Sequence, residues 1–249
     1  MLATLLDRSE GEELPLPEAI AARYGGPLRM PARSPHVFAN FVSTLDGVVS
    51  YDEPGAEQAK YVSAGHPDDR FMLAILRAVA DAVVVGAGTL RKEPKTVWTA
   101  EKVVPDLAPA FAELRKRMGL RPQPTTVIVT ASGEIDRSLP AFNSGVPVVV
   151  ASGKHLRAAE IVDLAVREGG GGRILTEGGP TLLGRFLEDG LVDELFLTIA
   201  PRLAGRSEDR RRLALVEGAA FRSASSPIGR LVSVKAADDY LFTRYAFRV

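Results

Sequence analysis

The sequence has no cysteine and only three histidines, at positions 36, 66 and 155. Without cysteine the chain has no disulfide, no thiol nucleophile, no iron–sulfur cluster and no cysteine-ligated zinc. The three histidines stand far apart and show none of the paired spacings of histidine metal sites. We therefore expect no metal centre.

The chain also has no excess of charge of either sign. Lysine and arginine together number 31, as do aspartate and glutamate, whereas nucleic-acid-binding domains normally carry a basic surplus. The strongest basic cluster, 210–212, directly follows Glu208 and Asp209, and this pattern favours a solvated helix face over a phosphate-binding site. No nucleic-acid partner is expected.

Long hydrophobic runs are missing too. No stretch approaches the ~18 apolar residues of a membrane span. The first residues are acidic and contain proline, without the basic-then-apolar order of a signal peptide. We therefore expect a cytoplasmic protein without a membrane partner, in which residues 1–34 form an N-terminal extension packed on the core and residues 35–249 form one domain.

An alternation of apolar strands and amphipathic helices fills most of the chain. The continuous β-branched runs are typical of parallel strands covered on both faces. Strands are expected at 37–42, 81–86, 125–130, 146–151, 173–175 and 191–201, and helices near 17–24, 67–79, 107–118, 158–165 and from 180 onward. Segments 230–235 and 240–248 predict a closing antiparallel hairpin. The pattern indicates a three-layer α/β domain with a mostly parallel sheet.

The most informative segment is 176–184, Thr-Glu-Gly-Gly-Pro-Thr-Leu-Leu-Gly. It follows a short strand and opens a helix, since Pro180 suits a first helical position. Gly178 and Gly179 allow close backbone approach, and the first turn of a helix offers unpaired N–H groups and a positive dipole end. The segment therefore predicts a phosphate site, with Glu177 beside it at the carboxyl end of the strand.

A second glycine turn, Gly86-Ala87-Gly88-Thr89, directly follows another apolar strand. It lacks the third glycine of a dinucleotide fingerprint, so a tight strand-to-helix turn is an equal alternative when it is taken alone. Together with segment 176–184 in one sheet, it indicates two turns that face the same nucleotide.

Two further elements are candidates for the site. Segment 40–47 ends in Ser-Thr-Leu-Asp-Gly, which suits either a ligand wall containing Thr44 and Asp46 or a plain hairpin turn. Arg77 lies beside the apolar face of its helix and is expected either to border the top of the sheet or to be a surface charge.

Segments 40–47, 76–89, 175–201 and 240–245 occur in the order seen in the reductase domain of riboflavin biosynthesis, and the chain resembles that family over about residues 36–249. The resemblance implies a dihydrofolate-reductase-like fold and a homodimer. The strand 192–200, which alternates in part and precedes Pro201, is the candidate to pair across a two-fold axis. It also implies NADPH-dependent reduction of 5-amino-6-(5-phosphoribosylamino)uracil, a small phosphorylated substrate, to the ribitylamino product.

The resemblance also implies roles for particular residues. Thr89 contacts the cofactor, the turn from 178 to 184 holds its pyrophosphate, and Arg77 and Glu177 face the substrate. A 2′-phosphate needs a group at the end of the strand 146–151, where Ser152, Lys154 and Arg157 are the candidates. Glu177 or Asp46 is the expected proton relay. The cofactor-binding set is Thr44, Gly86, Gly88, Thr89, Glu93, Ser152, Gly178, Gly179, Pro180, Thr181, Leu182, Leu183 and Gly184.

The loop 90–96 departs from the family pattern, because it lacks the usual Asp-Asp-Pro. We expect Glu93 to replace one aspartate and Lys92 and Lys95 to meet a substrate phosphate. Two alternatives follow: reduction of another heterocycle such as dihydrofolate, or a regulator that binds NADPH without turnover. The zinc deaminase that precedes this domain in bifunctional relatives needs cysteines, so deamination is expected to belong to another protein.

Overall fold

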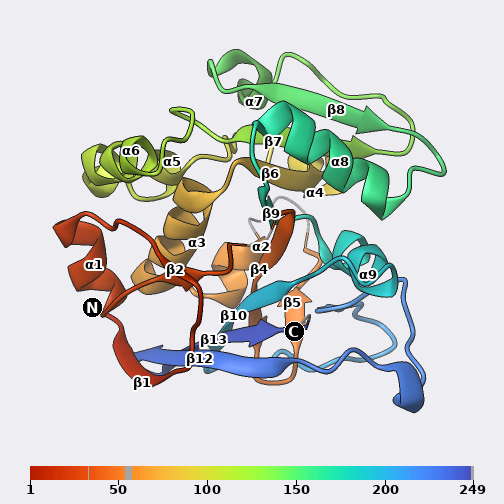
Figure 1. Cartoon of the computed structure of the whole chain (residues 1–249). Coiled ribbons are helices and arrows are strands. Elements are labelled where there is room, and N and C mark those ends of the chain that lie inside the picture. Colours follow the sequence, from red (N-terminus) through yellow and green to blue (C-terminus); the bar gives the residue numbers. More distant parts are fainter. Residues whose placement is uncertain (33, 54–57, 248–249) are drawn as a thin grey trace.

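The computed structural model describes residues 1–32, 34–53 and 58–247, and its centre is a nine-stranded sheet (Figure 1). The strand order is β1-β12-β13-β10-β4-β9-β6-β7-β8. Six neighbouring strands are parallel: β4 (His36–Thr44), β6 (Ala82–Gly86), β7 (Thr125–Thr130), β8 (Val148–Ser152), β9 (Arg173–Thr176) and β10 (Glu194–Ala200). Antiparallel pairing adds β13 (Tyr240–Ala246), β12 (Arg230–Ala237) and β1 (Ala3–Asp7). The predicted mostly parallel sheet with a C-terminal hairpin is confirmed.

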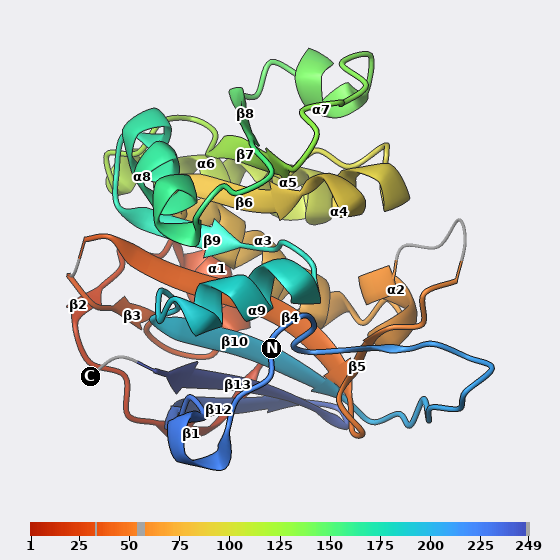
Figure 2. The ribbon, with the colours of Figure 1, turned by 90° about the vertical axis from the view of Figure 1, so that its right-hand side faces the viewer.

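Helices cover both faces of this sheet (Figures 1 and 2). One face packs against α8 (Ala158–Gly169) and α9 (Pro180–Glu188), and the other against α1 (Glu18–Tyr24), α3 (Pro67–Val79) and α6 (Ala108–Arg117). Strand residues alternate between the two cores, because successive side chains of a strand point to opposite faces. In β6, for example, Val83 and Val85 join the α3 side and Val84 joins the α8 side.

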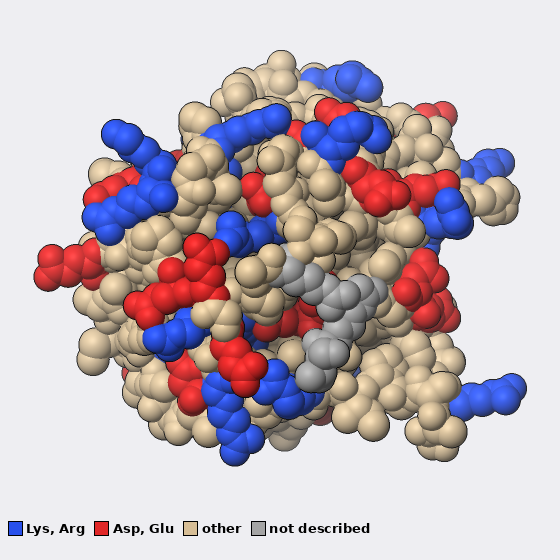
Figure 3. All heavy atoms as spheres, viewed as in Figure 1, with Lys and Arg blue, Asp and Glu red and all other residues tan. Residues whose placement is uncertain are grey.

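The remaining elements are short connections between these layers. They are the helices α2 (Gln58–Val62), α4 (Ala87–Lys92), α5 (Ala100–Val103) and α7 (Pro140–Asn143), the 3₁₀ turns η1 (Pro105–Leu107) and η2 (Ser223–Ser225), and the strands β2 (Glu12–Glu13), β3 (Arg29–Met30), β5 (Val48–Ser50) and β11 (Leu213–Ala214). Among the described residues, no helix has both the length and the apolarity that a bilayer crossing requires. Positive and negative side chains are interspersed over the face in Figure 3.

Helix boundaries follow the signals in the sequence. Pro67 is in the first turn of α3 with two acidic residues behind it, and α8 is followed by its C-cap Gly170, which is left-handed with φ 77°. A left-handed residue after a helix favours glycine, because glycine has no Cβ to clash. The helix predicted from 107 starts one residue later, since η1 forms the preceding turn.

Two regions differ from the simplest sequence interpretation. The N-terminal residues supply an edge strand of the main sheet, β1, and bury Leu2 and Ile20 in the α3-side core. The strand expected to pair across a two-fold axis, β10, lies inside the sheet between β4 and β13. That pairing prediction is wrong, because both hydrogen-bonding edges of β10 are already used.

A buried charged cluster connects three strands at the end of the sheet where the parallel strands begin. Glu194 of β10 accepts bonds from Arg244 Nη2 of β13 at 2.7 Å to each oxygen, and His36 Nε2 of β4 lies 3.0 Å from its Oε2. Arg244 also donates to the Arg29 carbonyl at 2.7 Å, which connects the N-terminal segment to the sheet. Burial alone raises the pKa of Glu194, but the His36 bond and the Arg244 charge outweigh it and lower the pKa below 4.5.

Replacing Glu194 with glutamine is expected to lower the free energy of unfolding by about 3–5 kcal/mol, because Arg244 then stays buried without a counter-charge. A lowered carboxyl pKa stabilises the native state above the unfolded value and loses that effect as pH falls through the native value. Urea unfolding from neutral pH to about pH 2 should therefore show a steeper acid loss in the parent than in the variant. Glu188→Gln at the exposed end of α9 is the control. Equal pH dependence of parent and Glu194→Gln would contradict the assignment.

Candidate active site

The connections of β6 and β9 create a crevice between them. These strands are neighbours, but the chain leaves β6 toward β7 on one side and leaves β9 toward β10 on the other. In an open α/β sheet such a switch of direction opens a space at the carboxyl ends of the strands, where ligands bind. Both glycine turns predicted from sequence directly follow these two strands.

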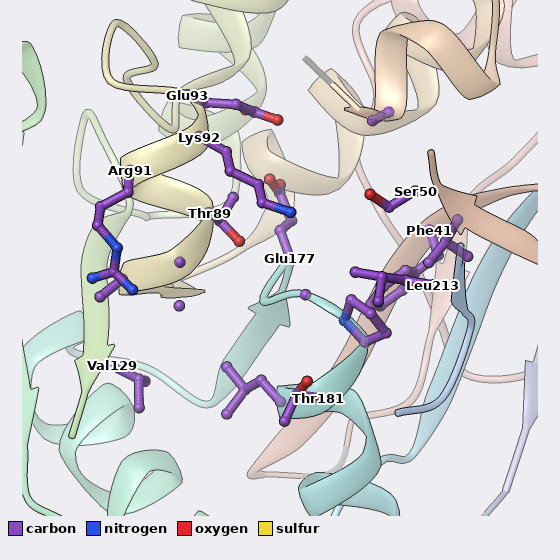
Figure 4. Close-up of a pocket in the computed structure, with 18 of the residues that line it drawn as sticks. Phe41, Ser50, Thr89, Arg91, Lys92, Glu93, Val129, Glu177, Thr181 and Leu213 are labelled. Carbon is purple, nitrogen blue, oxygen red and sulfur yellow. The ribbon is translucent and has the colours of Figure 1, made fainter. Parts of the chain in front are cut away.

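A cavity of about 600 Å³ occupies this position. Figure 4 shows Thr89, Lys92 and Glu93 on one side, Phe41, Ser50 and Leu213 on the other, and Glu177 between them. One end lies against β4, β5 and α3, and the other lies over the ends of β7 and β8. The predicted residues that line the cavity are Arg77, Gly86, Gly88, Thr89, Lys92, Glu93, Glu177, Gly179, Pro180, Thr181 and Leu182.

The start of α9 opens into the cavity. Gly179 is the N-cap, with φ −56° and ψ 174° and no capping bond from a side chain, and Pro180 follows at the predicted position. A Cβ added to Gly179 would find only Thr89 Oγ1, at 3.9 Å, and one added to Gly88 would meet nothing within 4 Å. The positive end of the helix dipole therefore faces space beside two positions without side chains, which suits a phosphate.

Five residues predicted for the cofactor lie outside the cavity lining, and three of these serve packing instead. A Cβ on Gly178 would stand 2.2 Å from Leu182 Cδ2, and one on Gly184 would stand 2.5 Å from the Glu217 carbonyl oxygen. Leu183 is buried in the α8–α9 core. These positions pack the loop and the helix α9 closely against their neighbours.

A buried ion pair forms part of the cavity wall. Arg77 donates from Nε to Glu177 Oε1 at 2.8 Å and from Nη2 to Oε2 at 2.6 Å, and their side chains are only 5% and 9% exposed. Glu177 is held by its own amide, which donates to the Val84 carbonyl at 3.0 Å. The surface-charge alternative for Arg77 is therefore wrong. The planar bidentate geometry fixes both groups beside any bound ligand.

Thr44 and Asp46 build a turn rather than a cavity wall. Asp46 is exposed and accepts bonds from the Thr44 hydroxyl, the Ala204 amide at 3.1 Å and the Gly205 amide at 2.8 Å. These bonds, the Thr44 hydroxyl first, lower the pKa of Asp46 to about 2. An ionised carboxylate outside the cavity cannot pass a proton to a ligand inside it. The geometry supports a turn rather than a ligand wall, although not a hairpin, since β5 pairs with β11 and not with β4. Asp46 is therefore not the proton relay of this cavity.

The two lysines that were predicted to bind the substrate lie in different surroundings. Lys92 lines the cavity and donates to Asp52 Oδ1 at 2.7 Å, whereas Lys95 is exposed outside the lining. Ser152 also lies outside the lining, while its neighbour Lys154, named with it as a 2′-phosphate candidate, lines the β8 end.

Sequence reasoning missed Asp69, Arg91 and Arg185, which all line the cavity. Helical spacing carried the signal for two of them. Asp69 precedes Arg77 by eight residues with Leu73 between, and Arg185 follows Thr181 by four, so each shares a helix face with a predicted residue.

The fold and the crevice define a class: an α/β domain with a cavity at a switch point between parallel strands, a position that suits an anionic ligand. Comparison with known proteins identifies the family. The RibD C-terminal domain family matches residues 35–238, and the chain belongs to it.

Relatives and solved structures agree with this membership. An Archaeoglobus fulgidus protein named 2,5-diamino-6-ribosylamino-4(3H)-pyrimidinone 5′-phosphate reductase is 27% identical over 194 residues, covering 69% of this chain and 82% of its own. Riboflavin biosynthesis protein RibD of Mycobacterium tuberculosis is 26% identical over 195 residues, covering 76% of this chain and 50% of its own. The chain thus spans about half the length of its RibD relatives.

Two crystal structures share the fold. A pyrimidine reductase-like protein of Corynebacterium diphtheriae superposes with a TM-score of 0.60 at 24% identity, covering 86% of this chain and 92% of its own. A deaminase/5-amino-6-(5-phosphoribosylamino)uracil reductase of Thermotoga maritima gives 0.61 at 20% identity, covering 86% and 57%. At these identities the likeness concerns the fold alone.

Proposed function

We propose that this chain is an NADPH-dependent reductase of riboflavin biosynthesis that converts the ribosylamino group of 5-amino-6-(5-phosphoribosylamino)uracil to a ribitylamino group. One observation supports this most strongly. In a member of the RibD C-terminal domain family, an uncapped helix start, two open glycine positions and a buried Arg–Glu pair line one cavity.

The residues present fit a dinucleotide. Gly179 and the first turn of α9 would hold its pyrophosphate, and Gly88 and Thr89 would contact the opposite side of the dinucleotide. Lys154, beside Ser132 and Gly153 at the β8 end, would meet a 2′-phosphate. A bound nicotinamide would supply the hydride, and the protein contributes binding, orientation and electrostatics.

The substrate would occupy the β4 end, where the Arg77–Glu177 pair and Lys92 lie. Reduction at the sugar carbon requires the ribosylamino group in its ring-opened form, in which that carbon is double-bonded to nitrogen, because hydride adds to an unsaturated carbon. The pair fixes the position of the pyrimidine, and correct placement of two reactants alone contributes up to about 7–11 kcal/mol to lowering a barrier. The same proposal includes a cytoplasmic location of the protein and its assembly into a homodimer.

Because the loop 90–96 departs from the family pattern, the experiment also tests two alternative functions. Both Lys92 and Lys95 were expected to bind a substrate phosphate. Lys95 lies outside the cavity and Lys92 donates to Asp52, so at most one of the two lysines is placed to bind that phosphate. Another heterocycle as substrate, or NADPH binding without turnover, would follow from a weakened phosphate site.

Purified protein should oxidise NADPH, followed by its near-ultraviolet absorbance, only when the aminouracil ribosyl phosphate is present. Parallel reactions with its 2-amino counterpart and with dihydrofolate identify the preferred ring. Calorimetry measures NADPH binding separately. If the protein binds NADPH but reduces none of the three substrates, the regulator replaces the enzyme as the proposed function. If it does not bind NADPH, both functions are contradicted.

A further inference from the structure

Asp69 lies at the end of the cavity where the substrate is expected. Asp69, Leu73 and Arg77 follow one another at intervals of four on α3, and all three line the cavity. At 1.5 Å per residue, Asp69 is therefore about 12 Å along the helix from Arg77. Val49 and Ser50 of β5 line the same cavity. The dinucleotide cradle at Gly179 and the β8 end with Lys154 are formed by other elements.

The surroundings of Asp69 favour a protonated carboxyl. Burial raises its pKa, and hydrogen bonds with the Thr198 and Ser63 hydroxyls and the charge of His66 act in the opposite direction without cancelling the rise. Tyr240 of β13, whose pKa is raised by burial and by the Asp69 charge, donates its hydroxyl to the Ser63 carbonyl at 2.9 Å. The other charged groups that line the cavity are Arg77, Arg91, Lys92, Glu93, Lys154, Glu177 and Arg185.

The other carboxyl groups that line the cavity accept hydrogen bonds from neighbouring side chains. Among the described residues, three carboxyl groups line the cavity: those of Asp69, Glu93 and Glu177. Both oxygens of Glu177 accept bonds from Arg77, and Glu93 Oε2 accepts one from the Thr96 hydroxyl at 3.3 Å. A carboxylate held by a guanidinium is an acceptor and has no proton to give.

We propose that Asp69 is the general acid of the reduction, an inference that rests on the proposed function. The Asp69 O–H bond breaks and its proton forms an N–H bond on the nitrogen of the substrate C=N group. The adjacent carbon takes a hydride from a dihydronicotinamide, so the C=N double bond becomes a C–N single bond. The dihydronicotinamide is oxidised and the carboxylate regains its proton from water.

The test compares Asp69→Asn with Asp68→Asn. Asparagine keeps the shape of Asp69 and can accept the Thr198 and Ser63 bonds, but has no acidic proton. Asp68, the preceding residue of the helix, lies outside the cavity lining and bonds to Arg23 Nε at 3.1 Å, so it is a matched control. Carbon-13 NMR of aspartate carboxyls follows the titration directly, and calorimetry follows NADPH binding.

In the parent, one aspartate should titrate above the ordinary range, and that signal should disappear in Asp69→Asn and remain in Asp68→Asn. The parent's kcat/KM should fall as pH rises through that pKa, because the acid form is required. In Asp69→Asn it should be lower by about 10²- to 10⁴-fold, the usual contribution of a general acid, without this fall and with unchanged NADPH affinity. Asp69→Asn turnover equal to the parent's would overturn the role of Asp69 alone. A parent that binds NADPH but reduces no substrate would overturn the proposed function as well.

Discussion

Gly179→Val is expected to weaken NADPH binding by about 100-fold or more and to leave the protein folded. The backbone at Gly179 has φ −56° and ψ 174°, which any L-residue adopts, and its added Cβ has only Thr89 Oγ1 nearby, at 3.9 Å. The valine methyls would instead fill the space in front of the first α9 amides. Each charge-assisted bond lost there is worth about 1.5–3 kcal/mol, so two lost bonds weaken binding by about 100-fold or more.

Calorimetric titration with NADPH measures this effect, and the far-ultraviolet circular dichroism spectrum and the urea midpoint check the fold. Gly184→Ala is the control within the same helix. Its Cβ would press on the Glu217 carbonyl at 2.5 Å, away from the cavity, so stability should fall while the folded protein still binds NADPH. If Gly179→Val bound the cofactor as tightly as the parent, the phosphate site would have to lie elsewhere.

Breaking the Arg77–Glu177 pair is the second large expected effect. Glu177→Gln leaves a buried guanidinium without a counter-charge, and removing one partner of such a pair costs about 3–5 kcal/mol. The double variant Arg77→Met with Glu177→Leu should regain most of that stability, because neither charge is then buried. Turnover should be absent in both, since the double variant loses the polar wall that the substrate needs.

Urea unfolding of the parent, Arg77→Met, Glu177→Leu and the double variant gives the coupling energy between the two positions. Calorimetry shows whether NADPH still binds, as expected from the separate position of the glycine cradle. A double variant with parental kcat/KM would show that the pair only stabilises the wall and does not recognise the substrate.

Much of the architecture was predictable from local patterns. Apolar β-branched runs predicted the six parallel strands within two or three residues, because burial on both faces excludes polar side chains. The helix start at Pro180 was predictable for a similar reason: proline lacks the N–H that a first turn leaves unpaired. The edge strand β1 was not, because its residues are largely exposed and show no comparable signal.

The functional residues were only partly predictable. The glycine turns carry their signal in consecutive residues, so their place after β6 and β9 followed from the sequence. Gly178 and Gly184 illustrate the limit of sequence-based prediction. The sequence does not distinguish a glycine that faces a ligand from one that packs against Leu182 or Glu217. Asp46 illustrates it again, because the three bonds that keep it ionised involve Thr44, Ala204 and Gly205.

The sequence by itself determined the alternation of strands and helices, the two glycine turns and the absence of cysteine chemistry, because each depends on neighbouring residues or on composition. Only the tertiary structure decided which charges meet. Arg77 and Glu177 are 100 residues apart in the chain, and Asp69 reaches the cavity only because α3 packs beside β4 and β9. Pairing and burial depend on distances in space, which the order of residues along the chain does not specify.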